Sequence, residues 1–400
     1  PYTCGGEKIE KKKNNKNPTL LFNRAELQNE CAKLFKLRPD ETLKIVQELY
    51  EKKLVTYPRT DARVLSSAVA KEISKNIKGL LSYEHANPFA GEILEQGSYK
   101  NIGKTRYVND KQITDHYAII PTGQGLGTLK SLNVQSARVY EVIVRRFLSI
   151  FYPPAVYQKI SLVSVTEKER LFSSFKVLIS QGYLKIAGYS FGKNKKEEIG
   201  QKGQEEEQTE DTAFLERIQK VKKGSSLPIQ KFYIKEGETS PPKRYTSGSM
   251  ILAMENAGQL IEDEELRAQI KGSGIGTSAT RAEILKKLIT IKYLALNKKT
   301  QVITSTLLGE MIFDVVNNSI RSLLNPELTA SWEKGLTYVA EGSITSEEYM
   351  VKLEDFIQRR TQGVLDLRNQ LTLKQYFDQA AGYYKKAAAK SGNKRPTEKK

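Results

Sequence analysis

The spacing of apolar residues changes near residue 155, and this change limits the folds that the chain can adopt. In the segment 136–151 apolar residues recur every three to four positions, which predicts an amphipathic helix. In 160–165 they alternate with polar residues, which predicts a strand. The helical spacing returns after residue 241. We therefore expect an α+β protein of several domains, in which helical parts flank a β-rich part.

Changes in spacing and composition divide the chain into five predicted segments. They are a basic linker at 1–17, a helical domain at 18–155, a β-rich hinge domain at 156–240, a mainly helical domain at 241–370 and a basic tail at 371–400, disordered from about residue 383. Within the β-rich domain we expect strands at 160–165, 172–179, 184–189 and around 229–234, and a flexible insertion at 192–211. Two short helices before residue 54 predict a layout like a helix-turn-helix.

The charge of the chain predicts a polyanionic partner. There are 64 Lys and Arg residues against 46 Asp and Glu residues, which gives a net charge of +18. Nucleic acid is the most common partner of such a surface, and an anionic membrane is the less common one. No apolar run approaches the length of about 20 residues that a spanning helix needs. We expect a cytoplasmic protein that binds nucleic acid, and a chain that begins within a longer protein because it opens on Pro1.

The segment 54–63 combines one tyrosine with two arginines. Pro58 disfavours helical backbone at Tyr57, so this tyrosine should lie extended just past a helix end. Arg59 and Arg63 are permanently charged donors that suit a phosphate. A tyrosine oxygen beside such donors could act as a nucleophile in phosphoryl transfer. The chain has 20 tyrosines, however, and most tyrosines serve packing or interfaces.

A histidine next to an aspartate forms a second candidate site in the segment 113–122. Asp115 can favour the charged form of His116, which could then bind a phosphate or donate a proton near neutral pH. The alternative is a histidine at the entrance to the buried strand 118–120.

Cys4 and Cys31 form no spaced set, so we expect neither a disulfide framework nor a zinc site.

A glycine-rich turn before a helix forms a third candidate site in the segment 272–284. Gly274 and Gly276 would let the backbone approach a phosphate, and the helix that starts near residue 279 would direct its N–H groups toward it. Thr280 and Arg281 add a hydroxyl and a guanidinium. The segment lacks Gly-Lys-Ser and is therefore not a nucleotide-binding P-loop.

Taken together, these segments resemble the motifs of type IA DNA topoisomerases, in the topoisomerase III branch. The segment 56–61 (Thr-Tyr-Pro-Arg-Thr-Asp) resembles the active-site tyrosine motif, and 115–122 resembles Asp-His-His-Ala-Ile-Ile-Pro-Thr with Tyr117 at the second histidine. The segments 241–246 and 274–281 resemble the Pro-Pro-x-Arg-[Tyr/Phe]-Thr and glycine motifs. The four motifs occur in the family's order, and the resemblance as a whole covers about residues 18–365.

The resemblance implies an arch-shaped fold and the cleavage and rejoining of single-stranded DNA through a 5′-phosphotyrosine, without ATP. Such chemistry would serve strand passage in relaxation or decatenation, by a monomer on nucleoid DNA with a helicase as a candidate partner. The implied catalytic residues are Tyr57, Arg59 and His116. The implied DNA-binding residues are Thr56, Thr60, Asp61, Arg63, Asp115, Thr122, Arg244, Gly274, Gly276, Thr277, Thr280 and Arg281.

One departure from the family concerns the metal. Type IA enzymes hold Mg²⁺ in a Toprim domain, and the sequence has no Asp-x-Asp on a hydrophobic strand. We therefore expect no metal ligands in this chain, a Mg²⁺ held by an absent Toprim domain, and little turnover by the chain alone. An ordinary tyrosine hydroxyl, with a pKa of about 10, is a poor nucleophile at neutral pH.

Two other readings compete with the topoisomerase. A recombinase or relaxase would also use a tyrosine, but neither His85 nor His116 lies in the His-x-x-Arg or paired-histidine pattern that those enzymes use. A module that binds single strands without chemistry would also use the many tyrosines and lysines, through stacking and phosphate contacts.

Overall fold

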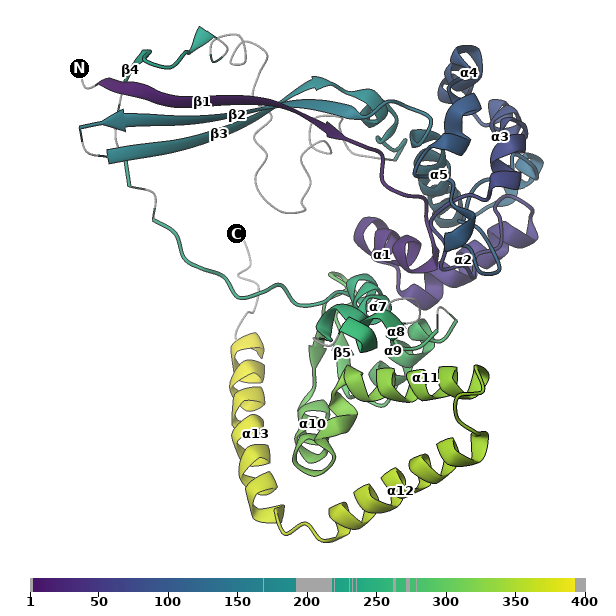
Figure 1. Cartoon of the computed structure of the whole chain (residues 1–400), viewed down its shortest axis with the longest axis vertical. Coiled ribbons are helices and arrows are strands. Elements are labelled where there is room, and N and C mark those ends of the chain that lie inside the picture. Colours follow the sequence, from purple (N-terminus) through teal and green to yellow (C-terminus); the bar gives the residue numbers. More distant parts are fainter. Residues whose placement is uncertain are drawn as a thin grey trace, which may run out of the picture. The chain divides into compact units, whose positions relative to one another are not determined.

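The computed structural model describes residues 3–167, 169–191, 218, 220–229, 231, 233–234, 236–261, 264–270, 274–277 and 279–392 (Figure 1). The chain forms two compact units. The first unit contains Pro1–Asn23 and Ile45–Pro242, and the second contains Arg24–Lys44 and Lys243–Lys400. Both helices and strands are present, as the predicted α+β class requires. The first unit therefore combines the predicted β-rich domain with most of the predicted segment 18–155.

A four-stranded antiparallel sheet belongs to the first unit and has the strand order β3-β2-β1-β4. Its strands are β1 (Thr3–Lys16), β2 (Ala155–Thr166), β3 (Glu169–Ser180) and β4 (Ser226–Pro228). Figure 1 shows β1, β2 and β3 as long neighbouring strands. The predicted linker at 1–17 is therefore wrong, because β1 lies between two other strands. Residues 11–16 of β1 are exposed, so pairing with β2, rather than side-chain burial, holds the strand and leaves no apolar period.

Two of the predicted strands are also wrong. The segment 184–189 contains the end of a 3-10 helix, η5 (Gly182–Ile186), and the described residues of 229–234 form no strand. The chain turns at Gly182, whose φ is 48° and whose position leaves only 2.4 Å between an added Cβ and the carbonyl oxygen of Pro153. Tyr183 then donates its N–H to the same oxygen at 2.9 Å. The predicted insertion at 192–211 lies outside the described residues.

The helical part of the first unit forms the core beside the sheet. Its helices are α3 (Ser67–Gly79), η1 (Leu80–Ser82), α4 (Asn87–Gln96), η2 (Ser98–Lys104), η3 (Asp110–Gln112), η4 (Leu126–Ser131) and α5 (Val134–Ser149). The Asn133 side chain caps α5 by accepting the N–H of Ser136 at 2.8 Å. Val139 and Phe147 of α5 are fully buried, as its helical spacing predicts.

The second unit is mainly helical and brings together segments that are far apart in the sequence. Its elements are α1 (Arg24–Phe35), the start of α2 (Pro39–Glu51), α7 (Ser247–Glu255), η7 (Ala257–Leu260), α8 (Glu264–Ile270), α9 (Arg281–Thr290), β5 (Leu294–Leu296), β6 (Ile303–Ser305), α10 (Leu307–Ser319), η8 (Arg321–Leu324), α11 (Pro326–Ala340), α12 (Ser346–Leu365) and α13 (Gln370–Gly392). Ala25 of α1 shares a core with Ile251, Leu285 and Ile303. An added Cβ on Gly248 would lie 2.6 Å from Asn29 Cα, so a glycine lets α1 and α7 approach closely.

The predicted basic tail is helical as far as residue 392. Residues 373, 377, 380 and 384 are partly buried, at the spacing of one helix face. Tyr384 Oη donates to Glu310 Oε1 of α10 at 2.8 Å, and Asn369 Nδ2 donates to the Asn318 carbonyl at 3.1 Å. The prediction of disorder from residue 383 is therefore wrong up to residue 392, because the helix continues to that residue and Tyr384 anchors it on α10. Within the described ranges, none of the helices combines the length and apolar character that a membrane crossing requires.

Candidate active site

Two segments of the first unit lie side by side at the candidate nucleophile. Tyr57 follows the end of α2 in irregular backbone, as Pro58 predicted. Thr56 donates its N–H to the Ile120 carbonyl at 2.9 Å and its hydroxyl to the Ala118 carbonyl at 3.0 Å. Ile120 in turn donates its N–H to Thr56 Oγ1 at 3.0 Å. These bonds fix the tyrosine segment against the buried strand-like residues that follow the candidate histidine.

Tyr57 and His116 lie in contact. Their ring centroids are 4.3 Å apart, with the ring planes inclined by 43°. Thr60 is buried and donates its hydroxyl to the carbonyl oxygen of His116 at 2.7 Å. The His116 side chain is exposed and Tyr57 is partly exposed, so a ligand in solvent can reach both rings. The structure therefore brings together the tyrosine and the histidine that the sequence motifs singled out.

A pocket of about 520 Å³ opens beside this pair. Of the predicted site residues, Thr56, Tyr57, His116 and Thr122 line it. The other polar and aromatic groups in its wall include Tyr50, Glu51, Lys53, Tyr117 and Gln124. None of them was predicted as a site residue, although the resemblance places Tyr117 at the second histidine of the family motif. Three of these belong to the last turn of α2 or follow it directly, and their short distance in sequence from Tyr57 was the signal available.

The remaining predicted residues of the first unit lie outside the pocket wall. Arg59, Asp61 and Asp115 are exposed, and none of them lines the pocket. Arg63 is partly buried and donates Nε to the Leu21 carbonyl at 3.2 Å, so part of its guanidinium supports the fold. His85, the other histidine, is exposed and packs edge-on against Tyr83 with a centroid separation of 5.5 Å. It does not belong to the pocket.

Burial raises the pKa of Tyr117 above its ordinary value. The raised pKa means that the Tyr117 hydroxyl is harder to ionise than that of a solvent-exposed tyrosine. Tyr117 is therefore poorly suited to act as a nucleophile, although it shares the pocket with Tyr57. It provides a matched tyrosine against which the role of Tyr57 can be tested.

The contacts of Thr60 predict that it positions His116. Its hydroxyl donates to the His116 carbonyl and accepts the N–H of Ala62 at 3.1 Å. We expect Thr60→Val to lower the free energy of unfolding by about 1–3 kcal/mol, because the buried Ala62 N–H and the partly buried His116 carbonyl both lose their partner. Circular dichroism during urea unfolding measures this change. Thr60→Ser should restore most of it, and equal stability of the serine and valine variants would contradict the hydrogen-bonding role.

The glycine motif belongs to the second unit, as does the exposed Arg244. Gly274 and Gly276 adopt φ values of 64° and 67°, which favour glycine. Arg281 is buried and donates Nε to the carbonyl of Ile275 at 3.2 Å, so it holds the turn from inside. Thr277 and Thr280 are exposed and hydrogen-bond to each other, and α9 starts directly after them. The turn thus presents hydroxyls near a helix N-terminus.

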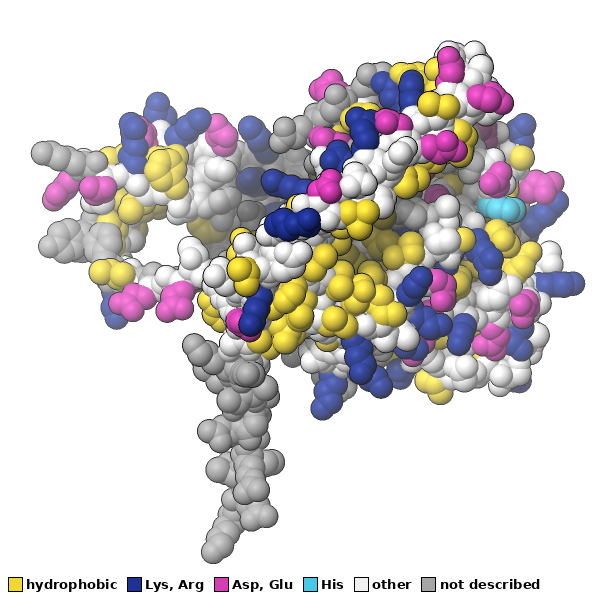
Figure 2. Space-filling model, turned by 90° about the horizontal axis from the view of Figure 1, so that it is seen from below, with side chains coloured by type: hydrophobic (Ala, Val, Ile, Leu, Met, Phe, Trp, Pro, Cys, Tyr) yellow, Lys and Arg dark blue, Asp and Glu magenta, His cyan; other side chains and the backbone are white. Residues whose placement is uncertain are grey.

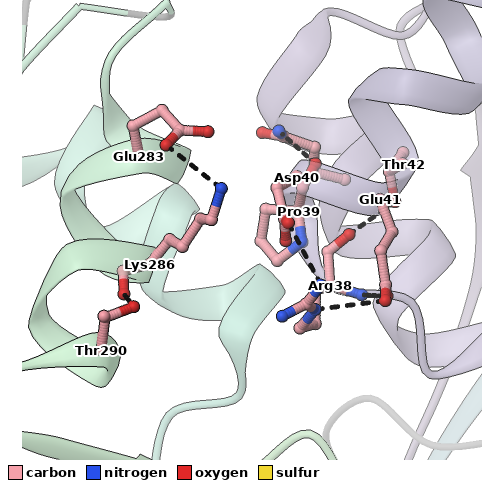
Figure 3. A network of polar contacts seen from close by, with 9 residues as sticks. Arg38, Pro39, Asp40, Glu41, Thr42, Glu283, Lys286 and Thr290 are labelled. Atoms are coloured by element: carbon pink, nitrogen blue, oxygen red, sulfur yellow. Dashed lines mark hydrogen bonds and ion pairs between the residues drawn. The ribbon is translucent and has the colours of Figure 1, made fainter. Parts of the chain in front are cut away.

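A smaller cavity of about 100 Å³ in the second unit lies between the start of α2 and α9. Figure 3 shows its charged groups. Arg38 pairs with Asp40 at 3.3 Å and with Glu41 at 3.2 Å, and Lys286 pairs with Glu283 at 3.6 Å. These cations are neutralised by neighbours on their own segments, so the cavity is a poor anion site.

Neither the pocket nor the rest of the described chain fits a magnesium ion. The described residues contain no group of three or more His, Cys, Asp or Glu side chains that could hold a metal. Glu51 lines the pocket beside Tyr57, and no other carboxylate joins it there among the described residues. Lys and Arg side chains are spread over the face shown in Figure 2, with Asp and Glu between them. Because the charges on this face are mixed, a phosphate would be bound by individual Lys or Arg side chains and not by a continuous basic patch.

Known proteins resemble this chain over most of its length. The relative from Bacillus licheniformis, a DNA topoisomerase 3, is 32% identical over 343 residues, which cover 85% of this chain and 44% of that protein. The DNA topoisomerase 3 of Bacillus subtilis is 30% identical over 353 residues, which cover 87% of this chain and 45% of that protein. The chain thus spans less than half the length of these relatives.

The fold also resembles that of a solved protein. Full-length topoisomerase I from Thermotoga maritima superposes with a TM-score of 0.61 and 21% identity over 92% of this chain and 53% of that one. At this identity the likeness shows the fold. The family described as DNA topoisomerase matches residues 6–351. Since this match includes the tyrosine, histidine and glycine motifs and covers most of the sequence, the chain belongs to the DNA topoisomerase family.

Proposed function

We propose that this chain is the strand-cleaving part of a type IA, topoisomerase III-like DNA topoisomerase. The observation that carries the proposal is the contact between Tyr57 and His116, with ring centroids 4.3 Å apart, in an open pocket of a chain of this family. Its substrate is single-stranded DNA, which matches a chain of net charge +18. The reaction serves relaxation of negative supercoils or decatenation, and it needs no ATP.

In the proposed reaction, Tyr57 Oη forms a bond to the phosphorus of a DNA phosphodiester while the bond to the 3′ oxygen breaks. The products are a 5′-phosphotyrosine and a free 3′-hydroxyl, and attack by that hydroxyl reverses the step. His116 binds or protonates the reacting phosphate, and Thr60 positions it through the carbonyl hydrogen bond of 2.7 Å. Arg59 is exposed two residues after Tyr57, where its charge attracts the DNA backbone. Mg²⁺ supplies electrostatic stabilisation to type IA enzymes, and we assign no step of this chain to it.

The metal ion, the location, the oligomeric state and the partner of the enzyme are also part of the proposal. We expect the enzyme to depend on Mg²⁺ held by a Toprim domain, to act in the cytoplasm on nucleoid DNA, and to work as a monomer that can cooperate with a helicase. The dependence on Mg²⁺, on the Toprim domain and on a helicase is tested by adding or withholding that component in a purified reaction.

The test is to trap the covalent adduct. The chain is mixed with Mg²⁺, a separately supplied Toprim domain and an oligonucleotide labelled at its 3′ end, and the reaction is stopped with detergent. We expect labelled protein on a denaturing gel, because a 5′-phosphotyrosine retains the 3′ portion of the strand. The same strand labelled at its 5′ end should release a short free fragment. Protein labelled only by the 5′-labelled strand would contradict the proposed polarity.

A module that binds single strands without chemistry is the alternative. It predicts salt-dependent binding of the oligonucleotide and no adduct, even when the Toprim domain and Mg²⁺ are present.

A further inference from the structure

Tyr50 and Lys53 line the pocket beside Tyr57, and the proposed chemistry gives neither of them a role. Tyr50 lies in the last turn of α2 and is 39% exposed. Its ring centroid is 5.5 Å from that of Tyr57, with the planes at 80°. Lys53 follows α2, is exposed and lines the same pocket. An exposed aromatic ring and a lysine thus stand beside the candidate nucleophile.

The backbone of Lys53 is held by two hydrogen bonds of its own and by one of the next residue. Lys53 donates its N–H to the Tyr50 carbonyl at 2.8 Å, and Leu54 donates to the Leu49 carbonyl at 2.9 Å, in the pattern that ends many helices. Thr122 Oγ1 donates to the Lys53 carbonyl at 2.5 Å. The φ of Lys53 is 62°. The lysine side chain therefore leaves the helix end in a direction that the fold sets.

The charge of Lys53 is available to a ligand. Glu51 is the neighbouring carboxylate in the pocket wall, and it accepts a hydrogen bond from Gln47 Nε2 at 3.0 Å. Within the part of the chain that the structure describes, Lys53 forms no ion pair. An ammonium group in the wall of an open pocket is suited to bind a phosphate. The ring of Tyr50 offers a surface on which a base can stack.

We infer that Tyr50 and Lys53 form a nucleotide subsite beside Tyr57. Tyr50 stacks on the base of a nucleotide that flanks the cleaved phosphodiester, and Lys53 binds a phosphate of that nucleotide. The pocket volume of about 520 Å³ is sufficient for one nucleotide. This subsite rests on the proposed function, because a nucleotide bound there would place the next phosphodiester of the DNA strand at Tyr57. It holds the strand while Tyr57 and His116 act on the reacting phosphate.

Lys53 also has a structural role that must be separated from binding, because a cation near a helix C-terminus stabilises the helix. Lys292 offers a close structural match after α9. Its φ is 62°, its N–H donates to the Ile289 carbonyl at 3.1 Å, and Thr306 Oγ1 donates to its carbonyl at 2.5 Å. Lys292 does not line the pocket. A comparison of Lys53 with Lys292 therefore distinguishes a helix-ending lysine from one that binds DNA.

The first experiment measures binding of a fluorescent single-stranded oligonucleotide to the 400-residue chain by anisotropy. We expect Lys53→Met and Tyr50→Leu each to raise Kd roughly 10-fold, because each removes one contact with a nucleotide. Tyr50→Phe should bind like the wild type, since it keeps the ring. Lys292→Met should change the thermal midpoint about as much as Lys53→Met and leave Kd within about 3-fold. Equal Kd values for the two lysine variants would overturn the subsite.

The second experiment locates the base. Oligonucleotides with one abasic site at successive positions around the cleavage point are tested for adduct formation with Toprim domain and Mg²⁺. At one flanking position we expect the wild type to show a raised KM, while Tyr50→Leu shows no further loss from the missing base. An abasic penalty that is the same in both proteins would overturn the stacking role.

The two readouts separate this proposal from the proposed function. Weaker binding by the Tyr50 and Lys53 variants without any adduct from the wild type would support the subsite and reject cleavage. An adduct at Tyr57 with unchanged Kd in both variants would support cleavage and reject the subsite.

Discussion

Replacing Tyr57 by phenylalanine is expected to abolish covalent capture of DNA. The substitution removes the oxygen that forms the bond to phosphorus and keeps the ring that contacts His116 at a centroid distance of 4.3 Å. Loss of a nucleophile lowers catalysis by more than about 10⁴-fold in enzymes that form covalent intermediates. The rate of adduct formation on denaturing gels, with Toprim domain and Mg²⁺ supplied, measures the effect. Oligonucleotide binding should remain within about 3-fold of the wild type.

Tyr117→Phe is the matched control for this prediction. Tyr117 lines the same pocket, and burial raises the pKa of its hydroxyl, which makes it a poor nucleophile. We expect this variant to form the adduct at a rate close to that of the wild type. An adduct that persists in Tyr57→Phe and disappears in Tyr117→Phe would move the nucleophile to Tyr117.

Replacing Gly274 by alanine is expected to cause a large loss of stability in the second unit. The φ of 64° disfavours any side chain, and the added Cβ would lie 2.5 Å from the Met254 carbonyl oxygen and 2.6 Å from that of Glu255. Because these contacts are with backbone atoms, they cannot be relieved by side-chain rotation. We expect the free energy of unfolding to fall by about 2–4 kcal/mol. The single tryptophan, Trp332, lies in α11 of the second unit and reports its unfolding by fluorescence.

Gly342→Ala separates the backbone conformation from the close contact. Gly342 also belongs to the second unit and has a φ of 74°, but an added Cβ would meet no atom within 4 Å. We expect this control to lose only about 1–2 kcal/mol. If the two alanine variants were equally stable, the close approach at Gly274 would not restrict the turn.

Local patterns predicted those elements whose side chains alternate between core and solvent. The helical spacing of 136–151 matches α5, and the alternation in 160–165 lies within β2. Pro58 correctly placed Tyr57 outside a helix. In these cases the interactions that determine structure are close in sequence or repeat along one face.

Long-range pairing explains the errors. β1 is held by its ladder with β2, whose residues lie about 150 positions further along the chain, so its exposed lysines gave no local signal. Helix α1 shares a core with α7, α9 and β6, which no period within α1 could indicate. The helical face of α13 was present in the sequence at residues 373, 377, 380 and 384. The high content of Lys near the end concealed it.

The candidate site was predictable in part. The motif resemblance identified Tyr57 and His116, and the structure places their rings in contact. It could not distinguish residues that face a ligand from those that face the protein. Thr60 and Arg281 are buried and bond to backbone carbonyls, so they shape the two motifs from inside. Tyr50 and Lys53 lay outside every motif, because their importance depends on the way that α2 ends beside the pocket.

The most direct measurement is to identify the residue that carries the trapped DNA. The adduct is digested with nuclease and trypsin, and the peptide that bears a residual nucleotide is sequenced by mass spectrometry. Cleavage after Lys53 and Arg59 releases the peptide 54–59, whose only tyrosine is Tyr57. The account predicts that the nucleotide is attached to Tyr57 in this peptide. A nucleotide attached to any other tyrosine would contradict it.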